Sequence, residues 1–456
     1  MQINKGTIKI LLISIVGFFS MESYSQQLDP VLKELIVKGL NKSQIVKINS
    51  IEAEQANLDQ RLARSVFIPK VTLNGSYTRL NDDITFDEDT QNLLVATQKL
   101  LIKEGAGLPF NAPFPEGIPL KDTPNLQDKN ILKTSLDMDW VLFSGFEVSN
   151  AIKASRHKEF SLNYLGMAEK DKIALKIIET YDKLALVYAS EKVLTISEKY
   201  LGEQEHFINK AIENGLATPI GRKKIELAQQ QLAGKQLRFE HNKTLLIEEL
   251  HRLTGEDRNH LRILHPKLES FNLNKTQTEK RNEIKALEEA EQATIYKSKM
   301  EKNHFIPKVA LRGHYEFIED YLSLLDPVWY VGVGIKWNIF DGNQSNLKAK
   351  KSTLESQIYR ERIEEAEEMI NLSIIKAEQT YQATLQASII VEKEIELASD
   401  TYDLTDKQYK HDLASINDVL DALTDLERAN FKLQESLFDQ RRAVAELLHA
   451  KGILQY

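Results

Sequence analysis

The chain contains no cysteine among its 456 residues. This absence excludes a disulfide framework, thiol catalysis, a zinc–thiolate site and lipid attachment to an N-terminal cysteine, so we do not expect a lipoprotein. Histidine is sparse as well, and none of the 10 histidines shows a ligand spacing such as His-Glu-x-x-His. We therefore expect no metal, no cofactor and no enzymatic activity.

Long apolar runs are equally scarce, which limits how the chain could meet a membrane. The apolar stretch at 10–19 follows two lysines and precedes the small residues Ser23 and Ser25. Because it is too short to span the ~30 Å hydrocarbon core, it is predicted to be a secretory signal peptide at 1–25, with a membrane anchor as the alternative. The net charge of −8 is too small and of the wrong sign for nucleic-acid binding.

Strict alternation of apolar and polar residues is present at about 308–318 and 328–340. A period of two predicts strands with one apolar and one polar face, and an Asp-Pro turn between the two runs favours an antiparallel hairpin. The apolar face contains Val331, Val333, Ile335 and Trp337, and the polar face contains Arg312, His314, Glu316 and Lys336.

The same unit occurs earlier in the chain. FIPKVTLNGSYTRL at 67–80 matches FIPKVALRGHYEFI at 305–318, and WVLFSG at 140–145 matches WNIFDG at 337–342. The earlier strands are predicted at about 71–80 and 131–143, with Trp140 on the apolar face and with Asp137 and Asp139 on the polar face. A catalytic pair is the alternative for these two aspartates, but no nucleophile or histidine neighbours them. The chain therefore contains two copies of one module.

Each strand pair is followed by a long segment without proline and with apolar residues at helical spacing. These long helices are predicted at about 146–213 and 343–410, with return helices at about 219–253 and 416–453. Equivalent positions of the two copies lie 197 residues apart, as at 173 and 370 or at 214 and 411. A helix of about seventy residues is about 100 Å long and has to be stabilised by packing against other helices.

The remaining segments complete two repeats, 26–276 and 277–456. Residues 28–66 and 279–303 are predicted to be helical, and 254–278 to be irregular. The long connection at 81–130 is rich in acidic residues and then in glycine and proline, and it is expected to be an outside loop with a short helix at 91–103.

The fold class predicted from these elements is α+β and mostly helical. Four strands cannot close a barrel, and open strand edges cannot face lipid, because unpaired backbone groups are costly there. Three copies would give a trimeric 12-stranded outer-membrane β-barrel, continued by a long α-helical periplasmic tunnel. The apolar strand faces would then contact outer-membrane lipid, and the polar faces would line the lumen.

The duplicated plan, WNIFDG at 337–342 and HDLASINDVLDALTDLERANFKL at 411–433 resemble the TolC-like outer-membrane efflux family. The resemblance covers essentially the whole mature chain, and DLASINDVLDA is its most specific part. It implies a homotrimeric channel-tunnel in the cell outer membrane of a Gram-negative bacterium, with a periplasmic extension. It also implies two partners, a periplasmic adaptor (membrane fusion) protein and an inner-membrane pump of RND or ABC type.

The resemblance further implies two kinds of site on the helices. The adaptor-docking tips map to Leu216, Ala217 and Thr218 in the first copy and to Leu413, Ala414 and Ser415 in the second. The periplasmic aperture maps to Asp418 and Asp421, whose first-copy equivalents are Gly221 and Lys224. The alternatives are a helix-capping role for Asp418 and a coiled-coil core position for Leu413.

These observations predict a passive exit path for the substrates of a tripartite efflux pump. The alternatives are the outer-membrane component of a type I protein secretion system and, more remotely, a trimeric coiled-coil adhesin or structural stalk. An adhesin would have one terminal block of strands, whereas this chain has two internal blocks. The cargo itself is not encoded in any recognisable motif.

Overall fold

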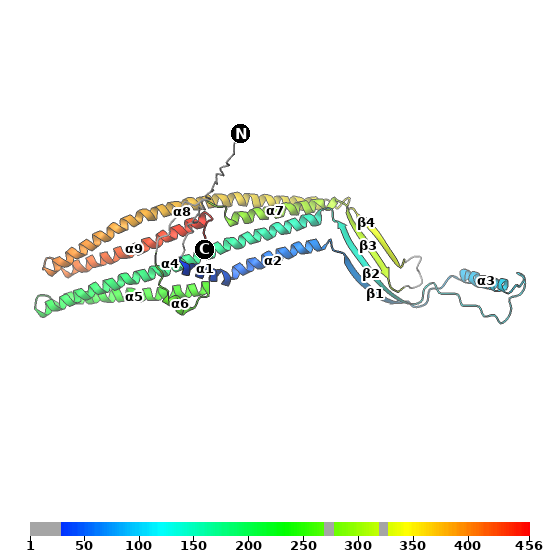
Figure 1. The fold of residues 1–456 in the computed structure, drawn as a ribbon, viewed down its shortest axis with the longest axis horizontal. Helices are drawn as coiled ribbons and strands as arrows, with labels where there is room; N and C mark the ends of the chain where they lie inside the picture. The colour runs from blue at the N-terminus through cyan, green and yellow to red at the C-terminus, as the bar shows by residue number, and fades with distance from the viewer. Residues whose placement is uncertain (1–28, 269–277, 319–326) are drawn as a thin grey trace, which may run out of the picture. The chain divides into compact units, whose positions relative to one another are not determined.

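The computed structural model describes residues 29–268, 278–318 and 327–456 (Figure 1). The predicted signal peptide at 1–25 and the loop that follows Ile318 lie outside the described residues. The described chain consists of α1 (Pro30–Lys42), α2 (Gln44–Ser65), β1 (Lys70–Arg79), α3 (Glu88–Gly105), β2 (Asn130–Phe143), α4 (Glu147–Glu213), α5 (Pro219–Thr254), α6 (Arg258–Ile263), α7 (Asn282–Lys302), the 3₁₀ helix η1 (Asn303–Phe305), β3 (Lys308–Glu316), β4 (Trp329–Lys336), α8 (Gln344–Lys410) and α9 (Ile416–Ala450).

Contacts divide the chain into two compact units, each of which draws on both repeats. Of the described residues, the helical unit comprises 29–47, 167–268, 278–282 and 367–456, and the sheet unit comprises 48–166, 283–318 and 327–366. The two sequence copies are therefore interleaved in space, and neither copy forms a compact body by itself.

The sheet unit contains one antiparallel sheet in the order β1-β2-β3-β4, in which the strands follow their chain order (Figure 1). The register sets Thr72 and His314 opposite Asp137, and Lys70 and Arg312 opposite Asp139. Polar residues of neighbouring strands therefore share one face. Among the described residues, β1 pairs only with β2 and β4 pairs only with β3, so both outer edges carry unpaired backbone groups.

Strand β4 is shorter in the structure than predicted. Strand β4 stops at Lys336, although the alternation extends to residue 340. The last β3–β4 pair joins Lys308 to Lys336, so that Trp337 stands opposite Pro307, which has no N–H to donate to the ladder. Trp337 therefore lies just beyond the strand in which we expected it.

The helix predicted at 28–66 is in fact two helices, α1 and α2, which are separated at Ser43. The backbone of Ser43 is extended, and its hydroxyl accepts a hydrogen bond from the N–H of Val46 at 3.5 Å, as a capping serine does. The short helix α6 was not expected either. Asp257 caps it by accepting hydrogen bonds from the N–H groups of Asn259 and His260.

One core cluster of the helical unit lies among α1, α4, α5, α6 and α9, and another lies among α4, α5, α8 and α9. Leu32, Leu35 and Ile36 of α1 are fully buried against α4 and α5. Gly39 allows this close approach, because a Cβ at that position would lie 2.4 Å from the Cδ1 of Ile177. None of the helices in the described part of the chain combines the length and apolar character of a membrane-spanning helix.

Candidate functional site: the sheet faces and the helix tips

The polar face of the sheet is a connected set of hydrogen bonds. One carboxylate oxygen of Asp137 accepts from Asn74 at 2.6 Å and from Ser135 at 3.1 Å, and the other lies 2.7 Å from the Nδ1 of His314. Two positions further along the same ladder, and on the same face, Arg312 donates to Asp139 at 2.8 Å. Neighbouring strands therefore satisfy one another's charges across this face. The expectation that no histidine neighbours the two aspartates was wrong, because His314 of another strand lies beside Asp137.

The other predicted members of the polar face lie at its two ends. Glu316 is buried, with 7% of its surface exposed, and it borders a hollow of about 200 Å³ on the polar face. Lys336 stands directly opposite Lys308, whose ammonium group lies 2.6 Å from the carboxylate of Glu147. Each of the six residues expected to line a lumen thus belongs to this face.

The opposite face of the sheet is apolar and uncovered in the single chain. Val331, Val333 and Ile335 expose between 64% and 72% of their surface, and Trp140 and Trp337 expose 37% and 60%. A strand face with this many exposed branched side chains requires a non-aqueous environment or a partner surface. These are the five residues predicted to contact lipid.

The two helix tips share one backbone geometry. Gly215 and Asp412, which are 197 residues apart, both have a left-handed backbone with φ of 71° and 59°. The next residue in each tip, Leu216 or Leu413, donates its N–H to a carbonyl five residues earlier at 2.8 Å. This hydrogen bond caps the C-terminal end of each helix, and the side chain of the same leucine lies on the surface.

The predicted docking residues are accessible in the chain. Leu216 and Leu413 are 78% and 77% exposed, so Leu413 is not a core residue of this chain. The neighbouring Ala217 and Ala414 are partly exposed. The last residues of the two elements, Thr218 and Ser415, are the N-caps of α5 and α9.

The two caps differ. Ser415 and Asp418 form a reciprocal capping box, in which Asp418 accepts from the N–H and the hydroxyl of Ser415, each at 2.7 Å. These hydrogen bonds lower the pKa of Asp418 below the ordinary value of an aspartate. Thr218 makes no side-chain cap and is followed by Pro219. Asp418 thus has the structural role that we considered as an alternative, and its charge is held at the tip.

Asp421 is exposed one turn further along α9. Its first-copy equivalent, Lys224, donates to the side chain of Asn417 at 2.7 Å and so joins the two tips. Deeper in the helical unit, Gln204 donates to Asp406 at 2.7 Å, and the rings of Tyr200 and Tyr402 lie 4.8 Å apart. These links between the two hairpins were not predicted, because no spacing within one helix reveals which residue of another helix it meets.

A buried ion pair joins α4 to α9. Arg441 donates to one oxygen of Asp182 at 3.0 Å and 2.7 Å, and both residues are more than nine-tenths buried. Burial raises the pKa of Asp182, and the hydrogen bonds from Arg441 oppose that rise. The sequence shows a charged residue on the apolar stripe of each helix. The periodicity does not indicate that these two residues pair with each other.

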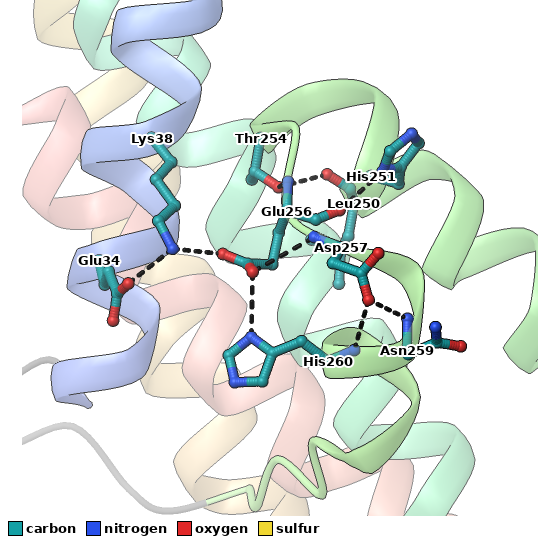
Figure 2. A network of polar contacts seen from close by, with 9 residues as sticks. All are labelled: Glu34, Lys38, Leu250, His251, Thr254, Glu256, Asp257, Asn259 and His260. Carbon is teal, nitrogen blue, oxygen red and sulfur yellow. Dashed lines mark hydrogen bonds and ion pairs between the residues drawn. The ribbon is translucent and has the colours of Figure 1, made fainter.

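A second polar network joins α1 to the corner between α5 and α6 (Figure 2). Lys38 lies 2.5 Å from Glu256 and 2.6 Å from Glu34, and Glu256 also contacts His260 at 3.1 Å. The hydrogen bond from Lys38 lowers the pKa of Glu256. These contacts attach residues 34–38 to the corner and so hold α1 against α5 and α6. No cluster of histidine and carboxylate side chains that could hold a metal ion occurs within the described ranges.

Comparison with known proteins identifies solved structures that have a similar fold. No family model matches the chain, and no curated protein matches its sequence. Solved structures do match. The outer membrane protein VceC from Vibrio cholerae is 16% identical with a TM-score of 0.71, and the match covers 92% of this chain and 96% of that chain.

Two outer membrane channels give similar results. The CmeC channel of Campylobacter jejuni is 16% identical with a TM-score of 0.71, and the match covers 99% of this chain and 94% of that one. The MtrE channel of Neisseria gonorrhoeae, in its open state, is 16% identical with a TM-score of 0.67, over 93% and 89% of the two chains. The chain therefore has the fold of the TolC-like outer-membrane channels, as its sequence resemblance predicted.

Proposed function

We propose that the chain is the subunit of a homotrimeric outer-membrane channel that provides the exit path of a tripartite efflux pump. The observation that carries this proposal is the sheet, which has one apolar face, one hydrogen-bonded polar face and two unpaired edges. Such a sheet is stable in a membrane only after β1 of one copy has paired with β4 of another. Three copies would contribute 12 strands and a polar lumen.

The helices attached to the two outer strands support the same assembly. In the sheet unit, α2 displays Ile48, Ile51, Leu58 and Leu62 at coiled-coil spacing, and all four are exposed. The start of α8 displays Leu347, Leu354 and Ile358 in the same way. A head-to-tail ring would bring α2 of one copy beside α8 of the next and would cover both stripes.

The remaining assignments belong to the same proposal. The exported chain would lie in the cell outer membrane with a periplasmic extension, and its tips would meet a periplasmic adaptor bound to an inner-membrane pump of RND or ABC type. Asp418 and Asp421 would form an acidic ring at the periplasmic aperture, where carboxylates attract cations. No catalytic step is assigned to the chain, because the pump would supply the energy.

Planar-bilayer recording of the purified protein tests the channel itself. We expect discrete conductance steps that favour cations, and a protein that forms no steps in bilayers would contradict the channel. Docking is tested separately in cells by Leu216→Asp and Leu413→Asp, which should abolish drug resistance without lowering the amount of protein in the outer membrane. Leu237→Asp, at another exposed leucine on α5, is the matched control. Retained resistance in the tip variants would contradict docking through the tips.

A further inference from the structure

Two of the three tryptophans in the chain make the same unusual hydrogen bond. The indole Nε1–H of Trp140 donates to the main-chain carbonyl of Phe67 at 2.9 Å, and that of Trp337 donates to the carbonyl of Phe305 at 2.9 Å. Among the described residues, no such bond is found for Trp329, which lies in the same sheet and is 66% exposed.

The strand register explains why both bonds form. The last pair of the β1–β2 ladder is Lys70 with Asp139, so the next position sets Pro69 opposite Trp140. In the second copy, the last β3–β4 pair sets Pro307 opposite Trp337 in the same way. Because proline has no N–H, the ladder cannot continue across it. The indole N–H instead binds the carbonyl two residues before the proline.

The same hydrogen-bond geometry occurs once in each copy of the module, although the connecting segments differ. The bonded residues are 73 positions apart in the first copy and 32 apart in the second, so the connections between them differ greatly in length. The shared elements are Phe-Ile-Pro-Lys at the entry to one strand and a tryptophan opposite it, which lies within β2 in the first copy and directly after β4 in the second. The geometry therefore depends on this pairing and not on the loop that joins the strands.

We infer that Trp140 and Trp337 are positioning residues that fix the chain where it enters β1 and β3. Phe67 follows the end of α2, and Phe305 ends η1. Each bond therefore joins the segment that leaves a helix to the neighbouring chain of the sheet, which is β2 in the first copy and the residue after β4 in the second. Because each indole N–H is already bound, neither is free to donate to a lipid headgroup. This assignment goes beyond the contact with lipid that we expected from the apolar face alone, and it stands whether or not the chain forms a channel.

Indole hydrogen exchange tests the inference on the intact protein. With ¹⁵N-labelled tryptophan the chain gives three indole signals, which Trp140→Phe, Trp337→Phe and Trp329→Phe assign one by one. We expect the N–H groups of Trp140 and Trp337 to exchange at least about tenfold more slowly than that of Trp329, because a hydrogen bond of ordinary strength has to open first. Equal exchange rates for all three would overturn the inference.

Heat unfolding provides the second measurement. Phenylalanine keeps an aromatic ring but removes the N–H donor together with part of the volume of the indole. Trp329→Phe makes the same change in volume without loss of such a bond, so Trp140→Phe and Trp337→Phe should each lower the unfolding midpoint more than Trp329→Phe does. An equal loss in Trp329→Phe would show that ring packing and not the N–H is responsible, and would overturn the assignment. The exchange rates are measured on the unchanged protein, and any two of the three variants assign all three signals, so the measurement remains decisive if one variant does not fold.

Discussion

Single residues at the second helix tip combine two physical roles. Asp418 caps α9 through Ser415, whereas Asp421 carries an exposed charge without that role. The resemblance predicted both residues as one acidic ring, and the structure adds that they differ in what else they do. The roles can therefore be separated by experiment.

We expect Asp421→Asn to change ion conduction while α9 keeps its cap, and Asp418→Asn to change conduction and also to weaken the start of the helix. The double variant should have the larger single-channel conductance and the weaker block by divalent cations, because fewer carboxylates would surround the aperture. Bilayer recordings measure both properties.

Asp412→Asn is the matched control for these variants, because it removes one charge from the same tip and asparagine also adopts the left-handed backbone found there. It should leave cation block unchanged. If the double variant conducts like the unchanged protein, the aperture is not formed by these aspartates.

Gly39 shows how one missing methyl group positions an element. Gly39→Ala should destabilise the protein by about 1–3 kcal/mol, because the new Cβ would overlap the Cδ1 of Ile177 in a packed core. Ile177→Val removes that atom and should restore part of the loss when the two changes are combined. Urea unfolding measures all three variants.

Gly234→Ala is the control, since Gly234 lies in the interior of α5 with nothing within 4 Å of a new Cβ. Alanine is favoured over glycine inside a helix by about 1 kcal/mol, so this variant should be as stable as the unchanged protein or more so. If Gly234→Ala lost as much stability as Gly39→Ala, overlap with Ile177 would not explain the loss in Gly39→Ala.

At the scale of elements, periodicity predicted where the helices begin and end, but it did not predict which residues of different helices meet. The observed α4, α5 and α8 begin and end within one residue of the predicted helices, because proline, glycine and apolar spacing are local signals. The links from Gln204 to Asp406 and from Arg441 to Asp182 could not be predicted, because they depend on how separate helices rotate against each other. The end of β4 at Lys336 was missed for a related reason, since Pro307, the proline opposite its end, directly precedes β3 and is distant in the sequence.

The ion pair between α4 and α9 leads to a prediction at this scale. Arg441→Met should destabilise the helical unit by about 3–5 kcal/mol, because Asp182 would stay buried without its partner. Changing both residues, with Asp182→Leu as well, should restore most of the stability. Chemical unfolding of the single and double variants measures the coupling, and equal losses in Arg441→Met and in the double variant would contradict it.

At the scale of the whole molecule, the proposed ring has a chemical test that the absence of cysteine makes clean. Leu62 lies three residues before the end of α2, and Leu347 lies three residues after the start of α8, so antiparallel neighbours would bring the two together. A chain with Leu62→Cys and Leu347→Cys should form covalent dimers and trimers on oxidation, and nothing larger, because a closed ring of three ends there.

Each single-cysteine chain is the control and should remain uncrosslinked, since a head-to-tail interface never sets the same residue against itself. A ladder that continues past three would indicate an open filament. Crosslinking confined to one chain would show that α2 meets α8 of its own copy. Either result would contradict the proposed ring, whereas the conductance measurement would still test the channel independently.

The unpaired margins of the sheet also have a consequence for biogenesis. In the proposed assembly, a newly exported subunit would expose two rows of unpaired amide and carbonyl groups beside an apolar surface before it meets its neighbours, and this combination promotes aggregation. Synthesis in excess of membrane insertion would then be harmful to the cell. We expect a periplasmic chaperone to shield the nascent subunit during transit, and its depletion should convert the protein into insoluble material rather than into a soluble monomer.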